Sequence, residues 1–114
     1  MIEDKRNQNI IIYHHPNPEI KSFLISEEIS APRVEHFKKP LQKGSEEISE
    51  LVGIFGAQIV KEIMLIPGVM EVRIKPKEIM VKKEESSSWE EIAGRVFEII
   101  NRAIKRKNIT LVKR

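Results

Sequence analysis

The apolar residues near the start of the chain are grouped as β-strands require. Residues 9–14, which read Asn-Ile-Ile-Ile-Tyr-His, are mostly β-branched or aromatic, and this run predicts a strand buried on both faces. The pattern resumes after Glu19, where Phe23 and Ile25 lie on one face of a second strand. The two strands are close enough along the chain to pair as a hairpin. Residues 31–37 predict a third strand of the edge type.

The segment between the first two strands is short and stiff. His15-Pro16-Asn17-Pro18 contains two prolines, which fix two φ angles and remove two backbone N–H donors. The residue before each proline is also pushed toward an extended conformation. We therefore expect a rigid, non-repetitive turn at this place.

Helical periodicity follows a loop over residues 37–45. Apolar residues then recur at spacings of three and four, as in an amphipathic helix: Ile48, Leu51, Val52, Phe55, Ile59, Ile63 and Ile66. Gly53 and Gly56 interrupt this pattern, and each costs about 1 kcal/mol in a helix interior. We therefore expect a short helical turn over residues 47–52, a firmer helix over residues 57–65, and an end at Pro67-Gly68.

The second half of the chain predicts a hairpin and then the longest helix. Residues 69–74 and 78–83 alternate in polarity on either side of Lys75-Pro76-Lys77. Ser88 and Glu91 fit a reciprocal capping box at a helix start. An apolar stripe then continues for about four turns, formed by Trp89, Ile92, Val96, Ile99, Ile100, Ala103 and Ile104. We expect Asn108 to break the helix and residues 109–112 to form a last short strand.

This order of elements predicts an α+β two-layer sandwich. Its mostly antiparallel sheet has four to five strands, and two main helices cover one face. A length of 114 residues predicts one domain, with a core over residues 10–104 and a basic segment over residues 105–114. The first six residues lack the apolar core of a signal peptide, so we expect a cytoplasmic protein. The sequence is rich in Glu, Lys and Ile, a bias that is typical of thermophile proteins.

Charge is unevenly distributed along the chain. The formal net charge is +3, but residues 101–114 contain six Lys or Arg residues and no acidic residue. The preceding hundred residues therefore carry 14 basic and 17 acidic side chains, so they are net acidic. A basic tail of this size supplies few phosphate contacts, and it also complements the negative end of a helix dipole.

The residues that commonly carry catalysis or bind metal ions do not form a recognisable set. The chain has no Cys, which excludes disulfides, thiolate catalysis and any iron–sulfur ligand set of its own. His14 and His15 are neighbours on a strand and point to opposite faces, and His36 is distant in the sequence. The Glu pairs fall at helix entries, where negative charge favours the dipole. Ser86, Ser87 and Ser88 form a cap, and neither Gly53 nor Gly56 belongs to a phosphate-binding loop. We expect no catalytic residue, no metal ligand and no cofactor.

Trp89 is the one tryptophan of the chain and has two interpretations. In the first, the indole anchors the start of the last helix on the sheet and keeps its polar edge at the surface. In the second, it is a hot spot for a partner protein. The first interpretation is favoured, and the second stays open.

Taken in order, several landmarks resemble one family, the N-terminal domain of Nfu/NifU-type iron–sulfur scaffold proteins. The resemblance covers about residues 10–104. It rests on His15-Pro16-Asn17-Pro18 with Phe23, then Ile63-Met64-Leu65-Ile66-Pro67-Gly68-Val69 with Val72, then Ile79-Met80-Val81-Lys82, and finally Trp89 with Ile92, Val96 and Ile100. The sequence departs from the family at Ala57-Gln58-Ile59-Val60, where the family has Ser-Pro-Leu-Ala, and at Lys77-Glu78, where it has Asp-Phe.

Full-length members of this family continue into a second domain, whose Cys-x-x-Cys pair binds a bridging iron–sulfur cluster. No such pair occurs here. The resemblance therefore implies the accessory half of an assembly protein, standing alone and without cluster ligands. Any family function would act through protein contacts.

Two functions follow from these observations. The first is a non-catalytic protein-interaction module related to iron–sulfur cluster assembly, with a scaffold or client protein as partner and with Pro16, Asn17, Pro18 and Trp89 as candidate contacts. The second is a small nucleic-acid-binding domain that uses the basic segment over residues 105–114 together with Lys75, Lys77, Lys82 and Lys83. We favour the first and expect neither nucleic acid nor membrane as the partner.

Overall fold

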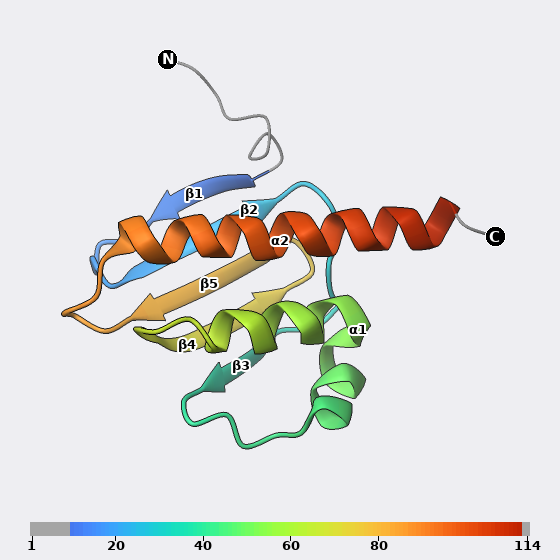
Figure 1. Cartoon of the computed structure of the whole chain (residues 1–114), viewed down its shortest axis with the longest axis horizontal. Helices are drawn as coiled ribbons and strands as arrows, with labels where there is room; N and C mark the ends of the chain where they lie inside the picture. The colour runs from blue at the N-terminus through green and yellow to red at the C-terminus, as the bar shows by residue number, and fades with distance from the viewer. Residues whose placement is uncertain (1–9, 113–114) are drawn as a thin grey trace, which may run out of the picture.

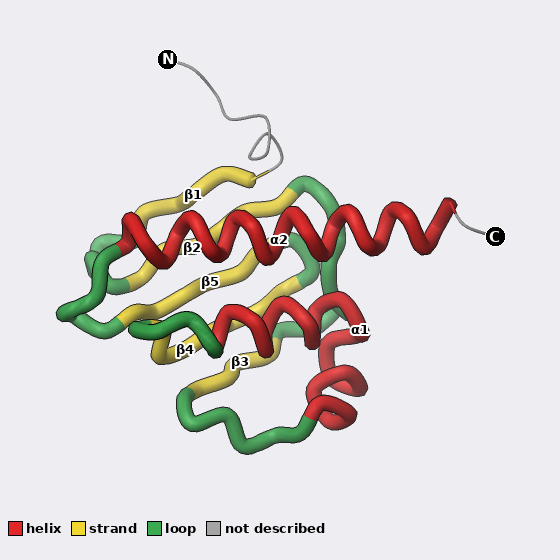
Figure 2. The backbone as a smooth tube through the Cα atoms, viewed as in Figure 1, coloured by secondary structure: helices red, strands yellow, loops and turns green. Residues whose placement is uncertain are grey.

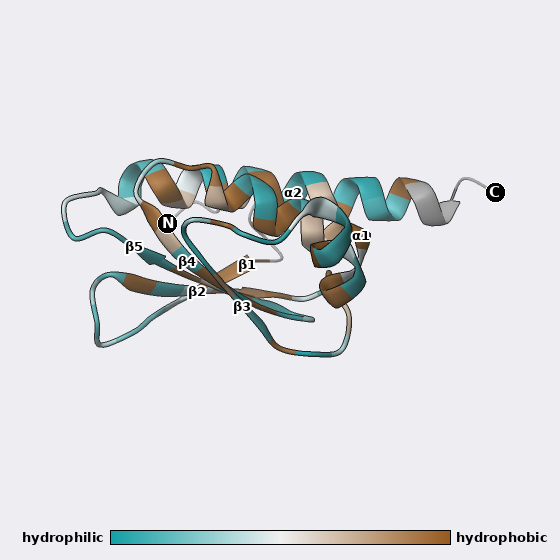
Figure 3. Ribbon diagram, turned by 90° about the horizontal axis from the view of Figure 1, so that it is seen from below, coloured by the Kyte–Doolittle hydropathy of each residue, from teal (hydrophilic) through white to brown (hydrophobic). Residues whose placement is uncertain are grey.

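The computed structural model describes residues 10–112, which form one antiparallel sheet and two helices (Figures 1 and 2). In chain order these are β1 (Ile10–His14), β2 (Ile20–Ile25), β3 (Glu35–Lys38), α1 (Ser45–Met64), β4 (Val69–Lys75), β5 (Glu78–Lys83) and α2 (Trp89–Val112). The strand order across the sheet is β1-β2-β5-β4-β3. Both helices lie on the same face of the sheet (Figure 3). The predicted α+β two-layer sandwich is confirmed.

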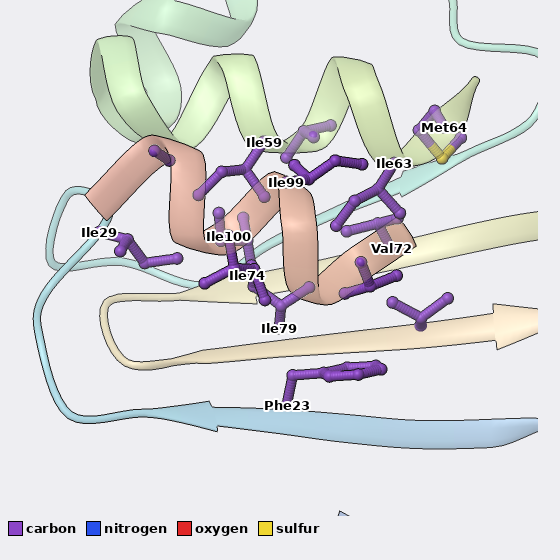
Figure 4. Packing of buried hydrophobic residues seen from close by; sticks show 14 of the residues in the cluster. Phe23, Ile29, Ile59, Ile63, Met64, Val72, Ile74, Ile79, Ile99 and Ile100 are labelled. Carbon is purple, nitrogen blue, oxygen red and sulfur yellow. The ribbon is translucent and has the colours of Figure 1, made fainter. Parts of the chain in front are cut away.

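The register of the strands places a row of apolar residues under the helices. Ile12 pairs with Phe23, Phe23 with Ile79, and Ile79 with Ile74. Opposite residues in paired strands point to the same face, and Phe23, Ile79 and Ile74 are fully buried. Figure 4 shows these side chains meeting Ile59, Ile63, Ile99 and Ile100 from the two helices. The core therefore lies between the sheet and the helix layer.

The first strand is an edge strand, and the prediction that it is buried on both faces is wrong. Ile10 is buried, but Ile11 is 67% and Tyr13 53% exposed. The helices cover only the other face of the sheet, so side chains on the Ile11 face meet solvent (Figure 3). The β1–β2 hairpin itself is confirmed. The third strand, predicted over residues 31–37, lies at the opposite edge and is shorter and shifted toward the C-terminus, over Glu35–Lys38.

Helix α1 bends at a single glycine. Gly53 has φ 88° and ψ 168°, which no helix contains, so α1 has two parts as its sequence predicts. Gly56 does not break the helix. It is buried beside Ser30, where an added Cβ would lie 2.9 Å from the Ser30 Cβ. Gly56 therefore permits the chain after β2 to approach the helix closely.

Helix α2 begins as predicted and ends later than predicted. The Ser88 hydroxyl accepts a hydrogen bond at 3.1 Å from the amide of Glu90, and not from that of Glu91 as the capping box requires. The helix then continues through Asn108 to Val112, so the predicted last strand over residues 109–112 is wrong. Asn lowers helix stability by less than about 1 kcal/mol, and this part of α2 extends past the sheet, away from the paired strands (Figure 1). Continuing the helix keeps its backbone groups hydrogen-bonded.

Candidate functional site

The four candidate contact residues come together at one end of the sheet. The indole Nε1 of Trp89, at the start of α2, donates a hydrogen bond to the carbonyl oxygen of Pro18 across 2.7 Å. Pro18 follows Pro16 and Asn17 in the turn between β1 and β2, and this turn lies beside the start of α2 (Figures 1 and 2). Segments 71 positions apart in the sequence therefore form one surface.

The turn is held by its own backbone and by the Asn17 side chain. The Asn17 carbonyl oxygen accepts from the amide of Ile20 at 3.0 Å, and its side-chain Oδ1 accepts from the amide of Glu19 at 2.9 Å. Pro16, Asn17 and Pro18 are all exposed. Because both prolines also restrict φ, the turn presents its surface with little conformational entropy left to lose on binding.

Trp89 has one side on the core and one side at the surface. It is half-buried and packs against the hydrophobic core, which confirms the predicted anchor role. Two ammonium groups lie over its ring. The Nζ atoms of Lys21 and Lys83 are 5.3 Å and 6.0 Å from the ring centroid. A cation over an indole face contributes about 0.5–1 kcal/mol at an exposed site.

Lys21 and Lys83 were not predicted as neighbours of Trp89, although strand periodicity contains a signal for them. Lys21 is two residues before Phe23, and Lys83 is two residues after Val81, so each shares the helix-facing side of its strand. Both lie at the end of the sheet where α2 begins. Their proximity to Trp89 depends on where α2 starts above the sheet, which periodicity does not determine.

Each of the two lysines has a hydrogen-bonding group close to its ammonium. Lys21 Nζ lies 2.6 Å from His14 Nδ1, and Lys83 Nζ donates to the Glu84 carbonyl oxygen at 3.1 Å. Within residues 10–112, no carboxylate oxygen lies within 4.0 Å of either ammonium. The site therefore offers hydrogen-bonding groups, positive charge and an aromatic edge. Groups of these kinds can contact a binding partner.

The three histidines lie apart and have separate contacts. His14 is beside Lys21, His15 Nε2 lies 2.8 Å from the buried Ser22 hydroxyl, and His36 Nε2 is 2.9 Å from Glu71 Oε1. Across residues 10–112, no three potential ligand side chains are placed to hold a metal ion. Each contact engages one ring nitrogen of its histidine, and the three contacts lie at different places on the sheet.

Two basic side chains near the C-terminal end of the chain contact other parts of the fold. Arg102 Nη2 lies 3.3 Å from Glu62 Oε1 of α1, and Lys107 Nζ donates to the Glu28 carbonyl oxygen. Lys105 is exposed. Lys113 and Arg114 lie outside the described residues. Fewer cations are therefore available to phosphates than the sequence count suggests.

Neither α1 nor α2 is apolar enough to cross a membrane over the residues described.

Two solved structures illustrate the likeness in fold. One is the crystal structure of protein SAV1430 from Staphylococcus aureus, which is 19% identical over 82% of this chain and 99% of that chain, with a TM-score of 0.58. The other is the solution structure of a NifU-like protein from Saccharomyces cerevisiae, which is 18% identical over 90% of this chain and 82% of that chain, with a TM-score of 0.60. No curated protein sequence matches the chain.

A family model described as "Scaffold protein Nfu/NifU N terminal" matches residues 10–107. This match includes the Pro16–Pro18 turn, the hairpin of β4 and β5, and Trp89 with most of α2. It covers the same part of the chain as the resemblance seen in the sequence landmarks. The chain therefore belongs to the Nfu/NifU N-terminal family of scaffold proteins.

Proposed function

We propose that this chain is a non-catalytic protein-interaction module of iron–sulfur cluster assembly, and that it binds its partner through Pro16, Asn17, Pro18 and Trp89. Family membership links the chain to cluster assembly. That the partner contacts these four residues is the more specific part of the proposal. The observation that supports it best is the 2.7 Å hydrogen bond from Trp89 to Pro18, since it makes one rigid surface from the turn and the helix start.

The composition of this surface suits protein recognition. Tryptophan is the residue type most enriched among binding hot spots, and it contributes most where neighbouring groups exclude water. Here the exposed turn lies on one side of the indole, and Lys21 and Lys83 lie over its ring. The turn and the ring are already ordered, so they lose little conformational entropy when a partner binds.

The absence of Cys supports the proposal that this chain binds no cluster itself. Iron–sulfur clusters are held mainly by Cys thiolates, and the sequence has none. The cluster ligands would then come from the partner. We propose a scaffold protein that carries the family's Cys-x-x-Cys domain, with a cytoplasmic location for the complex.

The contacts and burial of the polar side chains support the non-catalytic assignment. The imidazole rings of His15 and His36 are in contact with Ser22 and Glu71, and the Ser88 hydroxyl caps α2. Nucleophilic catalysis requires a base beside a nucleophile that a substrate can reach. His15 Nε2 lies 2.8 Å from the Ser22 hydroxyl, but Ser22 is only 1% exposed, so its hydroxyl is closed to a substrate.

An NMR titration tests this proposal directly. The protein is labelled with ¹⁵N and titrated with a purified scaffold protein that carries a Cys-x-x-Cys domain. Since Trp89 is the one tryptophan, its indole N–H gives a single resolved signal. We expect that signal and the amides of Asn17 and Glu19 to shift together and to saturate. Shifts confined to another surface, or no shifts at all, would contradict the proposed contact site.

A further inference from the structure

We infer that the exposed edge of β1 pairs with the β1 strand of a second copy of this chain, which gives a dimer with a continuous antiparallel sheet. This inference is independent of the proposed function. It rests on the difference between the two sheet edges, on the direction of the free backbone groups of β1, and on the self-complementarity of its sequence.

The two edges of the sheet differ in how they are protected. The β3 edge reads Glu-His-Phe-Lys and is followed by Lys39-Pro40, so it has the charges and the proline that discourage strand addition. The β1 edge reads Ile-Ile-Ile-Tyr-His and contains no Lys, Asp, Glu or Pro. Ile11 and Tyr13 on its outer face are 67% and 53% exposed. An uncharged, exposed edge strand of this kind is a template for pairing.

The backbone groups of alternate β1 residues point away from the sheet. The amide of Ile25 donates to Lys77 at 2.8 Å and the carbonyl of Glu19 accepts from Lys83 at 2.9 Å, so the odd-numbered residues of β2 bond toward β5. By alternation, Ser22 and Leu24 bond toward β1, where their partners are Tyr13 and Ile11.

The remaining β1 residues, Ile10, Ile12 and His14, therefore direct their N–H and C=O groups outward. None of these groups makes a backbone hydrogen bond to any residue of the described range outside the hairpin. Among the described residues nothing pairs with this edge, so it can receive a second strand.

The sequence of β1 is complementary to itself about Ile12. In an antiparallel pair with a two-fold axis at this residue, Ile12 faces Ile12 of the second copy and Ile10 faces His14. These pairs carry the outward N–H and C=O groups, so they exchange the hydrogen bonds. On the open face, Ile11 faces Tyr13 of the second copy, which forms an apolar row and opposes no like charges.

The short contact predicts a weak dimer. A single pair of five-residue strands buries less area than the roughly 1,600 Å² of a stable interface. We therefore expect association to depend on concentration in the micromolar to millimolar range. A partner strand from a different protein would leave the chain monomeric on its own, so the oligomeric state decides between the two occupants.

Sedimentation equilibrium of the whole chain from about 10 µM to about 1 mM tests the inference. We expect a reversible monomer–dimer equilibrium. Ile11→Lys places a charge in the apolar row and should raise the dimer dissociation constant about tenfold or more. The matched control is Ile54→Lys on α1, where the side chain is 74% exposed. This control should leave the dissociation constant within about twofold of the original value.

Amide exchange provides a second measurement that does not depend on a variant. The amide of Ile12 should exchange more slowly at high protein concentration than at low concentration, whereas that of Ile54 should not change. A chain that stays monomeric up to about 1 mM would overturn the inference. So would a dimer that Ile11→Lys and Ile54→Lys weaken equally, or one whose Ile12 amide is not protected.

Discussion

The indole Nε1 of Trp89 and the carbonyl oxygen of Pro18 are joined by a 2.7 Å hydrogen bond between the helix layer and the sheet layer. The bond fixes the start of α2 beside the turn that joins the end of β1 to the start of β2. It also places the exposed Pro16–Pro18 turn beside an aromatic ring that carries two cations. One contact therefore serves the fold and shapes the surface that we propose for partner binding.

Replacement of Trp89 separates its packing from its hydrogen bond. Trp89→Phe keeps a ring on the core but loses the bond to Pro18, which should lower the free energy of unfolding by about 1 kcal/mol. Trp89→Ala also loses the packing and should cost about 3 kcal/mol. Urea denaturation followed by circular dichroism measures both, since both variants lack tryptophan fluorescence. A loss below about 1 kcal/mol for Trp89→Ala would contradict the anchor role.

Neighbouring residues on β2 should differ sharply in their contribution to stability. Phe23 is fully buried and packs edge-on against Phe97, with ring centroids 5.6 Å apart. We expect Phe23→Ala to cost about 3–5 kcal/mol. Leu24 is on the open face, and Leu24→Ala should cost less than about 1 kcal/mol. Equal losses on chemical denaturation would show that the strand does not alternate as described.

The turn that follows α1 requires glycine at position 68. Gly68 has φ 94°, and an added Cβ would lie 2.7 Å from the Ser87 Cβ and still closer to the Ser87 hydroxyl. We expect Gly68→Ala to cost about 2–4 kcal/mol, of which roughly 1–2 comes from the positive φ. The double variant Gly68→Ala with Ser87→Gly removes the close contact but not the backbone strain. It should therefore be more stable than Gly68→Ala alone, as measured by thermal unfolding.

The basic segment should not give measurable binding to generic DNA or RNA. Lys107 of this segment is bonded to the Glu28 carbonyl oxygen, and Arg102, just before the segment, is paired with Glu62, so these two cations of α2 already have partners. A filter-binding titration at low and high salt tests this expectation. Steeply salt-dependent binding that is lost when residues 105–114 are removed would support the nucleic-acid function instead.

Much of the fold was predictable because most residues repeat with the period of their element. The alternation around Phe23 and the three-and-four spacing of α2 identify the core-facing residues directly. The burial of β1 was not predictable, because an apolar run such as Ile10 to Ile12 looks the same at the centre and at the edge of a sheet. The end of α2 was missed because Asn108 is only a mild helix breaker, and the choice depends on whether a strand lies nearby.

The candidate site was predictable only in part. The two prolines and the one tryptophan stand out by residue type, so Pro16, Pro18 and Trp89 could be chosen from the sequence. Their contact with one another, and with Lys21 and Lys83, depends on how α2 crosses the sheet. No local pattern encodes that crossing, since it results from the packing of the whole core.

The affinity of matched proline variants for a Cys-x-x-Cys scaffold protein tests the proposed contact most directly. Pro16→Arg changes the exposed turn, and Pro67→Arg changes an exposed proline after α1, elsewhere on the surface. Isothermal titration calorimetry should show binding at least about tenfold weaker for Pro16→Arg, which corresponds to about 1.4 kcal/mol, and unchanged binding for Pro67→Arg. Equal affinities for the two variants, with both still folded, would contradict a partner site at the turn and Trp89.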